Sequence, residues 1–150
     1  MIISADGTRH PTVTDTQILG FFDEFWFLSN FEKCHNKIEL YGFQFATSEH
    51  AYMAQKSRDL KDWEILASND SPSFARKYGQ TINLRPDWNE FRKEAMFVAC
   101  LQKFERNPEL AALLLATGDM YLEETNNWGD RFWGVMDGIG ENNLGKTLMK

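Results

Sequence analysis

The stretch TSEHAYMAQKS, from Thr47 to Ser57, predicts the helix around which the rest of the chain is arranged. Either Thr47 or Ser48 caps its start, because a hydroxyl oxygen can accept a hydrogen bond from an unpaired N–H of the first helical turn. Glu49 then lies in that first turn, where helix N–H groups stabilise a carboxylate or bind an anion beside it.

Four side chains of this stretch share one face of the predicted helix through spacings of i, i+3, i+4 and i+7: Glu49, Tyr52, Met53 and Lys56. The face carries a carboxylate and an amine about two turns apart, roughly 10 Å along the helix axis. That separation is too long for a helix ion pair and leaves room for a small molecule. An ordinary explanation is also open, a solvated charged face with Tyr52 and Met53 in the core.

Length and composition predict one globular domain over residues 1–150. The chain has 43% hydrophobic and 25% charged residues. Its longest apolar runs are too short to span a membrane, so no membrane partner is expected. The first residues show no basic segment followed by an apolar core, and the expected location is therefore the cytoplasm.

The cysteine, histidine and charge patterns exclude several classes of site. Cys34 and Cys100 lie far apart without a CxxC pair, which predicts separate thiols. The three histidines show no metal-ligand spacing, so neither a metal nor another cofactor is expected. A net charge of −6 argues against tight, non-specific binding of nucleic acid but leaves room for a local cationic pocket.

The remaining pattern predicts an α+β fold, helix-rich, with a small antiparallel sheet or hairpin. Alternating apolar residues around Tyr41 and Gly42 indicate a hairpin over 37–47. ILGFF, from residue 18, is strand-like, the ring-rich stretch after it is expected to fold inward, and Met120 to Glu123 is a candidate edge strand. Helices are predicted at 59–68, from Pro72 to just before Gly79, at 86–107 with Pro86 at its first position, and at 108–116.

Two polar segments are candidates for the edge of a binding pocket. Ser29, Asn30 and Phe31 place two hydrogen-bonding side chains beside a ring, although a local turn explains them equally well. The turn before Asn143 leads into a short helix, where backbone N–H groups can receive a phosphate. The aromatic content of 14% adds rings that a pocket for a flat base can use.

The ordered set of motifs resembles the NADAR family, also called YbiA-like. The resemblance covers about residue 20 to the C-terminus and rests on SNF (29–31), TSEH (47–50), QK (55–56), the Arg85 and Trp88 pair, TGD (117–119), the Asp130, Trp133 and Gly134 set, and the C-terminal Gly140, Asn142, Asn143, Leu144, Gly145, Leu148 and Met149. It implies a compact single α+β domain, with about residues 1–17 as a variable N-terminal lead-in, that cleaves the N-glycosidic bond of ribose-containing substrates. One branch of the family acts on pyrimidine intermediates of riboflavin synthesis, and another removes ADP-ribose from guanine.

The resemblance also implies roles for individual residues. Glu49 and Lys56 are expected to be catalytic, with Asp130 and Trp133 in the same pocket. A carboxylate stabilises the oxocarbenium charge on the sugar and activates water. The lysine holds phosphate or protonates the leaving group as an ammonium, or attacks C1′ as a free amine and forms a Schiff base. The second role requires a lowered pKa, which burial provides.

The expected substrate is a phosphorylated or ADP-ribosylated N-riboside, cleaved without metal, and ADP-ribosylated guanine in nucleic acid is included as a target. In this reading Trp88 or Trp133 stacks on the base, although core packing explains both, and Arg85 clamps a phosphate. The expected binding residues are Ser29, Asn30, Phe31, His50, Tyr52, Arg85, Trp88, Asp130, Trp133, Gly134 and Asn142. The alternatives are a non-catalytic binder of ADP-ribose or another NAD-derived nucleotide, and an interaction domain with exposed rings.

Overall fold

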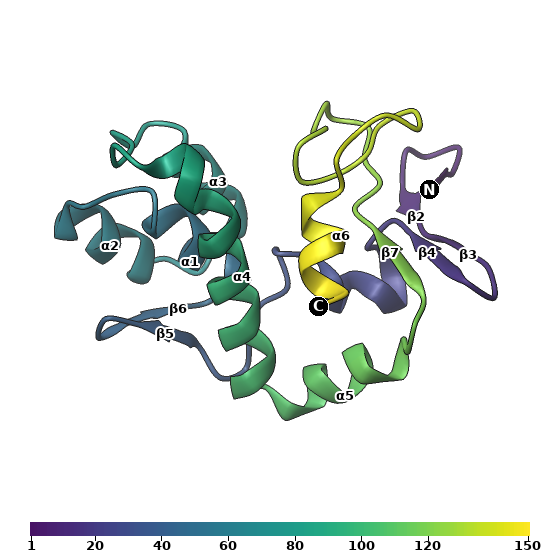
Figure 1. Ribbon diagram of the computed structural model, residues 1–150, viewed down its shortest axis with the longest axis horizontal. Helices are drawn as coiled ribbons and strands as arrows, with labels where there is room; N and C mark the ends of the chain where they lie inside the picture. Colours follow the sequence, from purple (N-terminus) through teal and green to yellow (C-terminus); the bar gives the residue numbers. More distant parts are fainter. The chain divides into compact units, whose positions relative to one another are not determined.

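The computed structural model describes residues 1–150 and divides into two compact units. Unit 1 consists of residues 1–29 and 112–150, and unit 2 consists of residues 30–111. Both units combine helices with short strands (Figure 1), so the predicted α+β class is confirmed. The assignment of the whole chain to one domain stays a prediction.

Unit 2 begins with the predicted hairpin. Its strands β5 (Ile38–Leu40) and β6 (Phe43–Phe45) pair antiparallel. Tyr41 and Gly42 form the two-residue turn, and both have positive φ, 50° and 84°. Such a turn matches the twist of paired strands, which makes glycine suited to its second position. The confirmed hairpin leads directly into the next helix.

That helix, α1 (Ser48–Ala54), lies at the centre of unit 2. Thr47 is its N-cap, as predicted, and accepts a hydrogen bond from the His50 N–H at 3.2 Å. All seven residues of α1 are buried, and the helix contacts α2 (Leu60–Ala67), α3 (Pro72–Gly79), α4 (Trp88–Arg106) and both strands of the hairpin. A short helix without a solvent-exposed face depends on tertiary packing for its stability.

The helices after α1 follow the prediction closely, with one correction. α4 begins at Trp88 rather than at Pro86. The Trp88 N–H donates to the Arg85 carbonyl at 3.1 Å, so residues 85–88 form a turn with proline at its second position, which proline favours. The turn thus takes the place of the expected first helical residues. The following helix, α5 (Pro108–Ala116), has the predicted bounds and crosses the sequence boundary between the units.

Unit 1 contains a three-stranded sheet in the order β3 (Thr12–Val13), β4 (Gln17–Leu19) and β7 (Tyr121–Glu123). β7 is an edge strand, as predicted, but it pairs parallel with β4. The predicted small antiparallel sheet or hairpin is present in β5 and β6, whereas this second sheet is mixed, because β7 reaches β4 from a distant part of the chain. β1 (Ile2–Ile3) and β2 (Arg9–His10) form a separate antiparallel pair.

The ring-rich segment after β4 is only partly internal. The predicted ILGFF strand ends at Leu19 because Gly20, with φ of 102°, turns the chain. Residues Asp23–Leu28 then form a 3₁₀ helix, η1, in which Phe27 and Leu28 are buried. Trp26 remains 38% exposed, so this ring did not fold inward.

The C-terminal helix α6 (Asn143–Leu148) packs against β7 in unit 1. A Cβ added at Gly145 would lie 2.1 Å from the Leu122 carbonyl oxygen and 2.4 Å from the Asn142 side-chain nitrogen. Helix and strand approach so closely here that only glycine fits.

Replacing Gly145 by alanine tests this contact. The substitution should lower the free energy of unfolding by about 3 kcal/mol, the upper end for overpacking a tight contact, because the obstructing atom belongs to the backbone. Chemical denaturation measures the change. Leu115→Ala, at a side chain that is 80% exposed, should change stability by less than about 0.5 kcal/mol. Equal stability of the two variants would contradict the close packing of α6 on β7.

Candidate active site

Asn30 holds the start of α1, and with it Glu49. The Asn30 carbonyl accepts the Glu49 N–H at 3.1 Å, and its side-chain oxygen accepts the Ser48 hydroxyl at 2.9 Å. The Asn30 amide nitrogen donates to Met96 Sδ at 3.4 Å. Glu49 itself is 8% exposed. Asn30, expected to contact substrate, therefore also has a positioning role for Glu49.

His50 lies wholly inside unit 2, with an exposed fraction of 0%. Its Nδ1 lies 2.7 Å from the Thr47 hydroxyl, while Nε2 has no hydrogen-bond partner. Burial lowers its pKa, an effect that nearby Asp70 opposes. A neutral ring is therefore favoured, and contact between His50 and substrate stays a prediction.

The first-turn N–H groups that could have received an anion already have protein partners. The Glu49 N–H is bonded to Asn30 and the His50 N–H to Thr47. These two backbone donors of α1 are therefore used for capping the helix.

Lys56 lies just beyond α1, which ends at Ala54. The expectation that the helix continues through Lys56 is wrong, because the chain tightens and the Lys56 N–H bonds to the Met53 carbonyl three residues back, at 3.2 Å. Its Nζ donates to the Gly79 carbonyl at 3.4 Å and lies 5.8 Å from the centre of the Tyr52 ring.

The Lys56 amine interacts electrostatically with the Glu49 carboxylate. Burial lowers the pKa of the Lys56 amine, and the Glu49 carboxylate partly counteracts this effect. A lowered pKa increases the fraction of neutral, nucleophilic amine near neutral pH. The two residues therefore interact even though Lys56 is outside the helix.

The Tyr52 ring beside Lys56 packs against further rings of unit 2. Tyr52 and Trp88 have centroids 5.3 Å apart with planes inclined by 52°, and Trp88 meets Phe91 edge to face at 6.4 Å. Trp88 is 6% exposed, so its ring takes part in core packing. Stacking of Trp88 on a substrate base stays a prediction.

Arg85 is engaged by other residues of unit 2. Its guanidinium bonds Asp87 through two nitrogens, at 2.6 and 3.0 Å, and lies 4.1 Å from the centre of the Phe91 ring. The hydrogen bond to Asp87 raises the pKa of Arg85. Its backbone N–H donates to the Lys56 carbonyl at 2.8 Å. To bind a phosphate as predicted, the Arg85 guanidinium would have to contact both the phosphate and Asp87.

In unit 1, Asp130 organises the start of the loop that carries Trp133. Asp130 Oδ1 accepts the backbone N–H groups of Phe132 and Trp133 at 3.2 and 2.9 Å. The rings of Phe132 and Trp133 lie edge to face, with centroids 4.8 Å apart. Ser29, which is buried at the end of the first segment of unit 1, donates its N–H to the Trp26 carbonyl.

Gly134 and Asn142 hold the same loop together. A Cβ at Gly134 would lie 2.2 Å from the Glu124 carbonyl oxygen. Asn142 has left-handed backbone, with φ of 52°, and its side chain accepts the Glu124 N–H at 3.0 Å and donates to the Leu122 carbonyl at 2.9 Å. Both residues therefore have clear structural roles, and substrate contact at either stays a prediction.

The turn before α6 does not offer free donors to a phosphate. The N–H groups of Asn142, Asn143 and Leu144 bond to the carbonyls of Gly134, Phe132 and Trp133 at 3.0 to 3.2 Å. The predicted phosphate role of these donors is wrong, because the neighbouring loop already occupies them.

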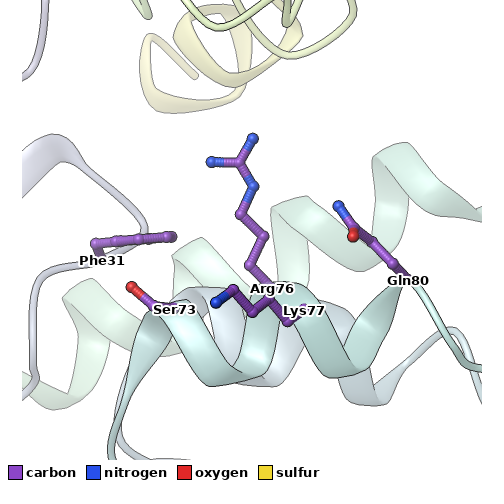
Figure 2. Close-up of a pocket in the computed structure, with 5 residues that line it drawn as sticks. All are labelled: Phe31, Ser73, Arg76, Lys77 and Gln80. Carbon is purple, nitrogen blue, oxygen red and sulfur yellow. The ribbon is translucent and has the colours of Figure 1, made fainter.

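Sequence reasoning missed a pocket of about 360 Å³ in unit 2. Figure 2 shows Phe31 facing side chains from α3, and the lining residues are Phe31, Ser73, Arg76, Lys77 and Gln80. We call it the α3 pocket. The four residues other than Phe31 are spaced at i, i+3, i+4 and i+7, a polar helix face that is detectable in the sequence but is usually only solvated.

No helix has the length and apolar character needed to cross a membrane. No three or more histidine, cysteine, aspartate or glutamate side chains gather into a group that could hold a metal ion.

The NADAR domain family matches residues 14–150, and the chain therefore belongs to the NADAR family. The chain is 36% identical over 157 residues to the N-glycosidase YbiA of Escherichia coli K12, a match that covers 100% of this chain and 94% of that protein. It is 41% identical over 128 residues to a riboflavin biosynthesis protein of Vibrio vulnificus, with 82% of this chain covered but only 34% of that longer protein.

Structural comparison agrees with this assignment. The NMR structure of E. coli YbiA matches with a TM-score of 0.78 and 36% identity, covering 91% of this chain and 83% of that one. An N-glycosidase of Nostoc punctiforme is 39% identical over 110 residues, which cover 69% of this chain and 70% of that protein. The fold is thus that of YbiA, and the names of the relatives support N-glycosidase activity in general terms.

Substitution of Asn142 separates its structural role from substrate contact. Asn142→Ala should lower the free energy of unfolding by about 3 kcal/mol, because it loses buried hydrogen bonds and places alanine in left-handed backbone. Asn142→Gly loses only the hydrogen bonds and should be about 1 kcal/mol more stable than the alanine variant. Thermal denaturation measures both.

Asn89→Ala, at an exposed position of α4, is the matched control and should leave the melting temperature unchanged. Full stability of Asn142→Ala together with a loss of activity would instead make Asn142 a substrate contact.

Proposed function

We propose that this protein is an N-glycosidase that hydrolyses the C1′–N bond of a phosphorylated or ADP-ribosylated N-riboside, with Glu49 and Lys56 as its catalytic residues. The observation that carries the proposal is the partly buried amine of Lys56, which bonds to the Gly79 carbonyl and whose pKa is lowered by burial and partly restored by the Glu49 carboxylate. A titratable group whose pKa is shifted both by burial and by a specific charged neighbour is typical of active sites.

Glu49 suits the charge that develops on the sugar. Breaking the C1′–N bond builds oxocarbenium character at C1′, which a nearby carboxylate stabilises. The same carboxylate can take a proton from the attacking water. The low exposure of Glu49 strengthens both effects, because water screens charge interactions more strongly than the protein interior does.

Lys56 supports two routes. As an ammonium it donates a proton to the departing base. As a free amine it attacks C1′, the C1′–N bond breaks, the ribose ring opens to an imine, and water then releases the sugar and regenerates the amine. The lowered pKa of Lys56 supports the second route.

The substrate that we favour is a ribosylamino-pyrimidine phosphate of riboflavin synthesis. Relatives named as riboflavin biosynthesis proteins support this choice. ADP-ribosylated guanine, free or in nucleic acid, is the second candidate that the resemblance to the family implies, and one incubation separates the two. Mass spectrometry without added metal should detect ribose 5-phosphate from the first substrate or ADP-ribose from the second.

Substitution of the two catalytic residues tests the proposed reaction. Glu49→Gln and Lys56→Ala should each lower kcat at least about 100-fold, since each removes a group that acts on the reacting atoms. Glu64→Gln and Lys61→Ala are the matched controls, because both are exposed residues of α2. Circular dichroism checks that all four variants are folded.

Wild-type turnover by Glu49→Gln or Lys56→Ala would disprove these assignments. Folded wild-type protein that binds either ligand tightly, but releases no product over a long incubation, would show a binding protein in place of an enzyme.

Reductive trapping tests the imine route. Borohydride with ribose 5-phosphate should attach the sugar to Lys56, because the neutral amine condenses with the open-chain aldehyde. The yield should rise with pH through the lowered pKa of Lys56. In Glu49→Gln the midpoint should move to lower pH, because the carboxylate that raises this pKa is gone.

Peptide mass spectrometry locates the adduct, and Lys61 serves as the exposed internal reference. Equal labelling of Lys56 and Lys61 at every pH would rule out a selectively reactive amine and leave direct attack by water as the route.

A further inference from the structure

The α3 pocket combines two cations with uncharged hydrogen-bonding groups. Arg76 and Lys77 are exposed neighbours on α3, and neither forms an ion pair. Ser73 and Gln80 add a hydroxyl and an amide on the same helix face, and the Phe31 ring lies across from them (Figure 2). An arginine beside a lysine in an open pocket is well suited to a phosphate, which the planar guanidinium can bind through two oxygens.

The α3 pocket is linked to the proposed catalytic residues through neighbours in the chain. The Gly79 carbonyl, next to Gln80, accepts a hydrogen bond from Lys56 Nζ. At the other side of the pocket, Phe31 follows Asn30, whose carbonyl accepts the Glu49 N–H. One boundary of the pocket is thus adjacent to the carbonyl that binds the Lys56 amine, and the opposite boundary is adjacent to the residue that holds the backbone of Glu49.

Packing between α1 and α3 keeps these links short. A Cβ added at Gly79 would lie 2.1 Å from Met53 Sδ, so α3 approaches α1 at a glycine. The close approach brings the end of α3, and with it the polar face of the pocket, beside the segment that carries Lys56.

We infer that the α3 pocket binds the phosphate of a ribose 5-phosphate group, with Arg76 and Lys77 as phosphate ligands and Ser73 as a hydrogen-bond donor. The inference rests on the proposed N-glycosidase function, because it names the site for the sugar-phosphate end of that substrate. A volume of about 360 Å³ is at the lower end for small-molecule pockets, roughly 300 to 1,000 Å³, and suits one sugar phosphate better than a dinucleotide.

Calorimetry with ribose 5-phosphate tests the inference without requiring turnover. The double variant Arg76→Ala/Lys77→Ala should bind it at least about 10-fold more weakly than wild type, since it removes hydrogen bonds from charged donors. The matched control Lys37→Ala/Lys61→Ala also removes two exposed cations of unit 2 and should bind like wild type. Ribose without phosphate should not distinguish any of the three proteins.

ADP-ribose is the second ligand titrated by calorimetry, because its phosphates form a diphosphate. Weaker binding of ribose 5-phosphate by Arg76→Ala/Lys77→Ala supports the site. Equal binding by that variant and wild type, no binding by wild type, or an effect confined to ADP-ribose would each overturn it. Loss of binding with no N-glycosidase activity in wild type would retain the phosphate site while rejecting the proposed function.

Kinetics then distinguish phosphate binding from a structural role. In an active enzyme, Arg76→Ala/Lys77→Ala should raise KM at least about 10-fold and change kcat less, because it weakens binding away from the reacting bond. Arg76→Lys/Lys77→Arg keeps both charges and should recover part of the affinity. A melting temperature equal to that of wild type confirms that the fold is intact.

Discussion

The structure of unit 2 depends on satisfying the backbone at the start of a buried helix. A helix leaves its first N–H groups without internal partners, and α1 has no exposed face from which water could reach them. Thr47 and Asn30 supply the missing acceptors. This requirement also determines where Glu49 lies, because the same hydrogen bond that caps the helix holds the backbone of the carboxylate residue.

Unit 1 meets the same requirement with asparagine side chains instead of a regular helix cap. Asn126 bonds the carbonyls of Asp130 and Val135, and Asn142 bonds the backbone of Leu122 and Glu124. An amide can donate and accept at once, so each side chain replaces contacts that a paired strand would have made. These hydrogen bonds give Trp133 a defined backbone conformation in an irregular loop, most of whose residues are exposed or half-buried.

Much of the fold could be predicted from local patterns. Turn chemistry at Gly42, the hydroxyl at Thr47 and helical periodicity each act within a few residues, and the structure follows them. The parallel pairing of β7 could not be predicted, because it joins distant segments without a local signature. For the site, spacing placed Glu49 and Lys56 on one face of a helix that in fact ends at Ala54, and it could not show the burial or the lowered pKa of Lys56. The polar face of α3 was visible in the sequence, yet only the opposing Phe31 distinguishes a pocket from a solvated helix.

The two units are nested in the chain, and this order affects how the protein is made. Unit 2 is continuous, so all of its residues have been synthesised once residue 111 is added. β4 belongs to the first 29 residues, but its parallel partner β7 begins only at Tyr121. During translation one edge of β4 therefore remains unpaired while the whole of unit 2 is synthesised. An unpaired strand edge is a site for unwanted association. Early occupancy of that edge, by a chaperone or by another nascent chain, would compete with completion of unit 1.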